Sequence, residues 1–261
     1  MPRYKLILEY DGAPFVGWQR QENGLSVQEV LEGALTAMTG ARATAHGAGR
    51  TDAGVHATSQ IVHFDAPVAR PQGAWIRGVN AHLPRAAAVL WCVSVPGEFH
   101  ARFAAIARHY TYLLLNRPER PGLGQGRVGW HHAPLDAAAM QEGAQHLAGR
   151  HDFSSFRAAE CQAKSPVKTI SRLRVVRFGA TIRIDLTADA FLHHMVRNVT
   201  GALVEVGKGK RPPSWIGELL QAGDRTRAAP TFAADGLYFV GADYDAGFEL
   251  PATRRDIPEP A

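Results

Sequence analysis

The chain has little cysteine for its size and no long apolar run. Only Cys92 and Cys161 occur among 261 residues, and no CxxC pair exists. This argues against a disulfide framework or a cysteine-based zinc site and suits a reducing compartment. No stretch approaches the ~18 consecutive apolar residues of a membrane span, and the first residues lack the apolar core of a signal peptide. We therefore expect a cytoplasmic protein with no membrane association.

Lysine is also scarce, with 5 lysines against 24 arginines and a formal net charge of +5. A basic surface fits a polyanionic partner, because cations that neutralise phosphates release condensed counterions. A skewed genomic composition produces the same bias, since alanine, glycine and proline are plentiful as well. Charge alone therefore leaves nucleic-acid binding open.

Motifs for cofactors and metals are missing. Residues 124–129 match GxGxxG in letters, but a Pro- and Arg-rich loop precedes them and no helix start follows, so they cannot hold a dinucleotide. Residues 201–209 have the wrong spacing for a phosphate loop. The histidine pairs 131–132 and 193–194 lack HExxH spacing, and adjacent side chains on a helix point about 100° apart. We expect no cofactor and no metal.

Hydrophobic periodicity and turn residues predict strands and helices in mixed order. The expected strands are 4–10, 59–64, 89–95, 108–115, 167–178, 181–186 and 237–244. The expected helices are 27–39 after a Ser26 N-cap, 75–82, 135–147, 191–206 and 213–220. Neither half alternates strictly, so we expect an α+β protein of two α/β lobes with mixed or antiparallel sheets. Pro96-Gly97 is the best candidate for a linker. The expected lobes are 1–104 and 105–250, and a disordered tail is expected at 251–261.

The most informative stretch is the glycine-rich segment 47–57, GAGRTDAGVHA. Its glycines allow backbone shapes that a Cβ forbids and let another molecule approach the main chain. The segment nevertheless presents Arg50, Thr51, Asp52 and His56, and loops on rigid scaffolds often carry catalytic side chains. On the residues alone, a turn capped by Asp52 beside a solvated Arg50 remains an alternative.

GRTDAGVHA resembles the signature of the tRNA pseudouridine synthase A family, and seven further segments resemble that family in the same order. They are YDG…F.GWQ from residue 10, GVNAHLP (78–84), FHARF (99–103), RHYTY (108–112), HDFSSF (151–156), FLHHMVRN (191–198) and GLYF (236–239). The likeness spans residues 4 to about 245, nearly the whole chain.

The resemblance implies a fold, an activity and a partner. It implies the pseudouridine synthase fold, with an RNA-binding cleft between the lobes. The implied activity is isomerisation of uridine to pseudouridine at positions 38–40 of the tRNA anticodon arm. The implied enzyme is a homodimer that needs neither metal nor organic cofactor.

The resemblance also assigns residues. The catalytic aspartate falls on Asp52, and the arginine that pairs with it falls on Arg197. The implied substrate-binding residues are Tyr110, Arg50, Thr51 and Leu237. The family often has Arg or Lys where this chain has His109 and His193, which puts local phosphate contacts in doubt but leaves the catalytic positions unchanged.

The chemistry is consistent with this set. Pseudouridine formation breaks the C1′–N1 bond and joins C1′ to C5, without oxidation and without loss of the base. It needs a carboxylate, which a nearby guanidinium keeps charged, and a pocket for the detached uracil. The predicted helix 191–206 places Arg197 opposite its apolar stripe, near His193 and Gly201, whereas a solvated face is the alternative. Core packing is the alternative for Tyr110.

A base in a stem must be everted, at a cost of a few kcal/mol, which phosphate contacts must offset. Candidates for those contacts are Arg20, Arg77, Arg102, Arg108, Arg117, Arg120, Lys208, Lys210 and Arg211. A non-catalytic RNA-binding protein is the main alternative, but it would have no use for an aspartate in a glycine loop. An Asp-nucleophile hydrolase is the third hypothesis, but it would need a second carboxylate or an Asp-rich metal motif.

Overall fold

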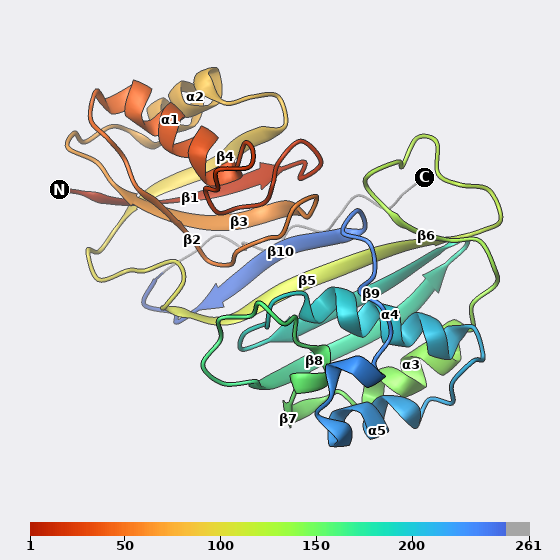
Figure 1. The fold of residues 1–261 in the computed structure, drawn as a ribbon. Coiled ribbons are helices and arrows are strands. Elements are labelled where there is room, and N and C mark those ends of the chain that lie inside the picture. The colour runs from red at the N-terminus through yellow and green to blue at the C-terminus, as the bar shows by residue number, and fades with distance from the viewer. Residues whose placement is uncertain (249–261) are drawn as a thin grey trace. The chain divides into compact units, whose positions relative to one another are not determined.

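The computed structural model describes residues 1–248 and divides into two compact units (Figure 1). Of the described residues, unit 1 comprises Met1–Arg108 and 238–248, and unit 2 comprises His109–Leu237. This differs from the expected lobes 1–104 and 105–250, because the last strand returns to the first unit to pair there. The expected tail 251–261 lies outside the described residues.

Unit 1 contains a mixed sheet in the order β4-β1-β3-β10. Its strands are β1 (Arg3–Tyr10), β3 (His56–Asp65), β4 (Ala87–Val95) and β10 (Leu237–Tyr244), with the short β2 (Ala45–Gly47) against β3. β1 runs antiparallel to both β3 and β4, whereas β10 pairs in parallel with the start of β3, opposite His56 and Ala57. β10 thereby supports the strand that follows the glycine-rich segment.

The two helices of unit 1 pack against one another and carry part of its core (Figure 1). α1 (Val27–Thr39) begins as expected, with the Ser26 hydroxyl accepting a hydrogen bond from the Glu29 backbone N–H at 3.2 Å, and ends at Gly40 in a left-handed conformation. α2 (Gln72–His82) packs on β4. Its buried Trp75 contacts the rings of Tyr4 and Phe64.

Unit 2 contains the strand order β5-β9-β8-β7, with β6 beside β5. The strands are β5 (Ala105–Asn116), β6 (Gly129–His131), β7 (Gly149–Asp152), β8 (Val167–Phe178) and β9 (Thr181–Ala188). The expected hairpin is confirmed, because β8 and β9 are antiparallel and Gly179 between them has a φ of 54°. Both units therefore have the mixed α+β architecture expected from the sequence.

The helices of unit 2 are α3 (Ala137–Gln145), α4 (Met195–Gly207) and α5 (Trp215–Ala222), with 3-10 turns η1 (Ser154–Phe156) and η2 (Arg225–Arg227). The expectation of a helix from residue 191 is wrong at its start. His194 has a φ of 60°, which breaks the helix, so α4 begins at Met195. Leu192 is buried ahead of the helix and extends the apolar pattern, which explains the error. His193 is consequently not one helical turn before Arg197.

Among residues 1–248, no helix combines the length and the apolarity that a membrane crossing requires.

Candidate active site

Asp52 lies in the loop between β2 and β3, and a second loop fixes its backbone. Asp52 and Gly17 form an isolated antiparallel bridge, and the Trp18 N–H donates to the Thr51 carbonyl at 2.9 Å. Gly17 has a φ of 114°, and a Cβ there would lie 2.6 Å from the Thr51 carbonyl oxygen. Only glycine fits this conformation and this approach without strain. The YDG…F.GWQ segment is therefore the support of the GRTDAG loop.

The loop turns sharply directly after Asp52. The Val55 N–H donates to the Asp52 carbonyl at 3.1 Å, and Gly54 has a φ of 77°. Gly12 is equally constrained, since a Cβ at that position would meet the Val55 carbonyl oxygen at 2.1 Å. The Asp52 side chain is half-buried. The fold thus presents a carboxylate from a rigid turn without sealing it inside the core.

A chain of buried polar groups lies beneath the loop. The hydroxyls of Thr51 and Tyr10 are 2.8 Å apart, and the Gln60 amide nitrogen donates to the Gly49 carbonyl at 2.8 Å and contacts the Tyr10 hydroxyl at 3.5 Å. Burial raises the pKa of Tyr10 to about 12, so its hydroxyl stays protonated. Thr51 is buried and points to Tyr10, so its side chain supports the loop from within.

His56 fastens the far end of the loop. Its Nδ1 accepts a hydrogen bond from the Gly12 N–H at 3.0 Å and lies 3.2 Å from an Asp11 carboxylate oxygen. Its ring stacks on Tyr238 at a centroid distance of 4.7 Å. His56 is 2% exposed, so it acts as part of the scaffold. Arg50 is exposed at the opposite end of the loop, where a cation can reach a phosphate.

Tyr110 and Tyr112 both lie on β5 and are buried in unit 2. Tyr110 contacts Phe191 edge-to-face at 5.0 Å. The Tyr112 hydroxyl donates to the Ala233 carbonyl at 2.9 Å, and burial, followed by the Asp235 charge, raises the pKa of Tyr112. The Tyr112 hydroxyl thus binds the backbone of the segment before β10, whereas Tyr110 packs on Phe191, which precedes α4.

Arg197 projects from the first turn of α4 and is half-buried. Its Nε donates to the Phe232 carbonyl at 2.8 Å, and its own carbonyl accepts from the Phe232 N–H at 3.2 Å. Gly201 on the same helix allows another segment to approach closely, because a Cβ there would lie 2.3 Å from the Pro230 carbonyl oxygen. Arg197 is therefore oriented by the segment before β10.

Leu237, the last predicted binding residue, opens β10 and is 5% exposed. Of the predicted set, Arg50, Thr51 and Asp52 share one loop of unit 1, whereas Tyr110, Arg197 and Leu237 belong to unit 2. Sequence reasoning missed the residues that orient them. These supporting residues are Tyr10, Gln60, Tyr112, Asn198, Arg225 and Thr231. Asn198, Tyr10 and Tyr112 carried a signal, because they lie in the MVRN, YDG and RHYTY segments.

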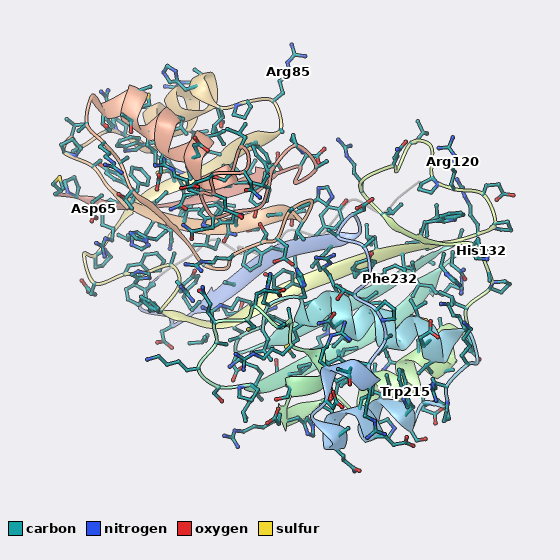
Figure 2. All side chains as sticks on the ribbon, in the orientation of Figure 1. Asp65, Arg85, Arg120, His132, Trp215 and Phe232 are labelled. Carbon is teal, nitrogen blue, oxygen red and sulfur yellow. The ribbon has the colours of Figure 1, made fainter. Side chains whose placement is uncertain are left out.

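Several candidate phosphate-binding cations contact groups within their own unit. Arg20 pairs with Glu32 at 2.9 Å and Lys208 with Glu205 at 2.6 Å, and Arg108 donates to the Ala105 carbonyl. Arg77, Arg117, Arg120, Lys210 and Arg211 are exposed, and Arg120 is labelled on the long loop of unit 2 in Figure 2. Arg20 is exposed as well, Arg117 donates to the Glu119 carbonyl and Arg211 lies over the Trp215 ring, so exposure alone does not separate the candidates for phosphate contacts.

Comparison with known proteins gives consistent matches to one family. A family model described as tRNA pseudouridine synthase matches residues 6–104 and 144–245. The chain is 55% identical over 99% of both chains to "tRNA pseudouridine synthase A" of Thiobacillus denitrificans. It is 57% identical to the protein of that name from Dechloromonas aromatica, over 98% of this chain and 97% of that protein.

A third relative, from Methylobacillus flagellatus, carries the same name and is 54% identical over 98% of each chain. A solved structure titled "Structure of H/ACA RNP bound to a substrate RNA containing 2'-deoxyuridine" aligns with 91% of this chain and 47% of that chain. Its TM-score of 0.41 and identity of 9% are too low to support a functional inference. The family match covers both units, including the Asp52 loop and the first turn of α4, so this chain belongs to the tRNA pseudouridine synthase family.

Proposed function

We propose that the protein isomerises uridine to pseudouridine in tRNA, with Asp52 as the nucleophile. The observation that supports this most directly is the half-buried carboxylate of Asp52, held on a rigid glycine turn in a member of the tRNA pseudouridine synthase family. Because it is half-buried, this carboxylate keeps part of its surface open to a nucleotide.

The reaction is balanced without a redox partner. The C1′–N1 bond breaks, the uracil turns, and C1′ bonds to C5. The hydrogen on C5 leaves as a proton, while N1 gains one. Asp52 supplies the anionic oxygen that attacks the nucleotide and then departs. Arg197 favours the charged form of that carboxylate, and Tyr110 offers a flat ring to the detached base.

Arg50 contributes a phosphate contact at the exposed end of the loop, and Thr51 holds the loop through the Tyr10 hydroxyl. Leu237 supplies apolar surface to the uracil. The target is a uridine at positions 38–40 of the anticodon arm. The protein acts in the cytoplasm as a homodimer, and light scattering on the purified chain should give twice the mass of one chain.

Tritium release from tRNA tests the proposal. An unmodified transcript labelled at uracil C5 is incubated with the native protein, with Asp52→Asn and with Asp136→Asn. Asp136 is the matched control, because it is the exposed N-cap of α3 and asparagine caps a helix equally well. Loss of a nucleophile costs on the order of 10⁴-fold in rate, so Asp52→Asn should release almost no label. Asp136→Asn should stay within about twofold of the native rate.

The outcomes separate the competing functions. Release at the native rate by Asp52→Asn rules Asp52 out as the nucleophile. If the native protein binds tRNA but neither form releases label, the protein is a non-catalytic RNA-binding protein. Transcripts without uridine at 38–40 should release no label, and release from them would contradict the proposed target.

A further inference from the structure

The ten residues from 228 to 237, here called the strap, connect η2 to β10 and run along α4 (Figure 1). The strap has no regular secondary structure before Leu237, so its shape depends on contacts with the rest of unit 2. On β5, the Tyr112 hydroxyl binds the Ala233 carbonyl, and the Leu113 N–H donates to the Gly236 carbonyl at 2.8 Å. On α4, the strap is held by the turn that contains Arg197.

Asn198 is the centre of the α4 contacts and is fully buried. Its Nδ2 donates to the Phe156 carbonyl at 2.8 Å. Its Oδ1 accepts from the Thr231 hydroxyl at 2.7 Å and from an Arg225 terminal nitrogen at 3.0 Å. The amide therefore makes three hydrogen bonds to three separate segments, which are η1, η2 and the strap. Together they leave the Asn198 side chain one orientation.

Arg225 closes the same network. One of its terminal nitrogens donates to the Ala229 carbonyl at 2.8 Å, and the other donates to the Thr231 hydroxyl at 3.1 Å as well as to Asn198. Hydrogen bonds from a charged donor are stronger than neutral ones. Arg225 and Asn198 together thus clamp the strap at Ala229 and Thr231, on either side of Pro230.

The residue after the clamp is the one that orients Arg197. Phe232, labelled in Figure 2, accepts a hydrogen bond from Arg197 Nε and donates its N–H back to the Arg197 carbonyl. Because Nε is committed to the strap, Arg197 can meet a carboxylate only through its two terminal nitrogens. The direction of those nitrogens follows the position of Phe232, and Thr231 fixes that position.

We propose that Thr231, Asn198 and Arg225 are positioning residues that set the direction of the Arg197 guanidinium during catalysis. The inference rests on the proposed function, in which Arg197 serves the Asp52 carboxylate. It assigns the strap a role in the rate of the reaction, whereas a merely structural strap would affect only folding.

Substitution at Thr231 distinguishes the two roles. Valine has nearly the same shape as threonine but lacks the hydroxyl, so Thr231→Val removes the bond to Asn198 and the acceptor for Arg225. Thr231→Ser keeps the hydroxyl. Thr226→Val is the matched control, because Thr226 is exposed on η2 and its hydroxyl contacts only Asp224 among the hydrogen bonds of residues 1–248.

The measurements are the single-turnover rate of pseudouridine formation at saturating tRNA, the tRNA Kd and the melting temperature. A misplaced catalytic group costs roughly 10- to 100-fold in rate. We expect Thr231→Val to lose about tenfold in rate with its Kd unchanged within about twofold. Thr231→Ser should regain most of the rate, and Thr226→Val should match the native protein.

The proposal is overturned if Thr231→Val retains the native rate, or if Thr231→Ser is as slow as Thr231→Val. It is also overturned if the loss of rate merely follows the fraction of unfolded protein. These failures are distinguishable from failure of the proposed function. If the proposed function fails, the native protein itself forms no pseudouridine, or Asp52→Asn forms it at the native rate.

Discussion

The Asp52 loop and the first turn of α4 hold their functional side chains by different means. The loop is held by backbone–backbone contacts: Gly17 forms a bridge with Asp52, and the Trp18 N–H donates to the Thr51 carbonyl. The first turn of α4 is held by side-chain hydrogen bonds, since Arg197 and Asn198 each bond to the strap. A backbone contact demands particular glycines, whereas a side-chain contact demands hydrogen-bonding partners. The two regions should therefore fail under different substitutions.

The largest effect should follow Gly17→Ala. The new Cβ would lie 2.6 Å from the Thr51 carbonyl oxygen, in a conformation with a φ of 114° that L-residues rarely adopt. We expect a loss of roughly 3 kcal/mol in unfolding free energy. Displacement of the loop should also reduce activity by about 100-fold or more. Urea unfolding and tritium release measure the two effects.

Gly33→Ala is the control for this substitution. Gly33 lies in α1 with nothing within 4 Å of a new Cβ, so alanine there should stabilise the protein by up to about 1 kcal/mol. If Gly17→Ala were as active and stable as Gly33→Ala, the backbone bridge would not hold Asp52.

A smaller effect is expected for Gly201→Ala in the other region. The Cβ would meet the Pro230 carbonyl oxygen at 2.3 Å and push the strap away from α4. Alanine favours the helix by about 1 kcal/mol over glycine, which offsets part of the clash. We therefore expect a net loss of only about 1 kcal/mol but roughly a tenfold loss in rate. A variant that loses stability and keeps its full rate would contradict the link between strap and catalysis.

A third effect, on acid stability, is specific to unit 1. His63 is buried against His46 and His100, at ring distances of 4.8 and 4.5 Å, and its Nδ1 accepts the Ala101 N–H. Burial, and then the charges of His100 and His46, lower the pKa of His63 to about 3. An unfolded histidine has a pKa near ~6.5. The unfolded state therefore takes up this proton first, and the stabilisation present above about pH 6.5 declines as the pH falls toward 3.

Between pH 7 and pH 5 we expect this group to cost roughly 1–2 kcal/mol of unfolding free energy, measured by urea titration at each pH. His63→Gln should flatten the dependence. His132→Gln, at an exposed position of unit 2 labelled in Figure 2, should leave it unchanged. An identical slope in all three proteins would show that His63 contributes nothing to acid sensitivity.

Local patterns predicted much of the secondary structure correctly. The Ser26 cap and the Gly40 end of α1 were readable because both are local hydrogen-bonding features. The error at the start of α4 has a physical cause as well. Leu192 is buried like a helix residue, but His194 adopts a left-handed conformation, and periodicity does not detect a single reversed φ.

For the candidate site, the sequence by itself pointed to Asp52 as the residue proposed to carry the chemistry. The loop and its YDG…F.GWQ support are both contiguous segments that resemble the family, so Asp52 could be assigned by that resemblance, whereas the glycine-rich pattern alone left a turn capped by Asp52 open. Tertiary structure decided how Arg197 is oriented. Asn198, Arg225 and Thr231 are separated by up to 33 residues, and each is an ordinary polar residue until folding buries it against the others. Hydrogen bonds between distant side chains leave no periodic trace in a sequence, because any chain segment of suitable length can bring the partners together.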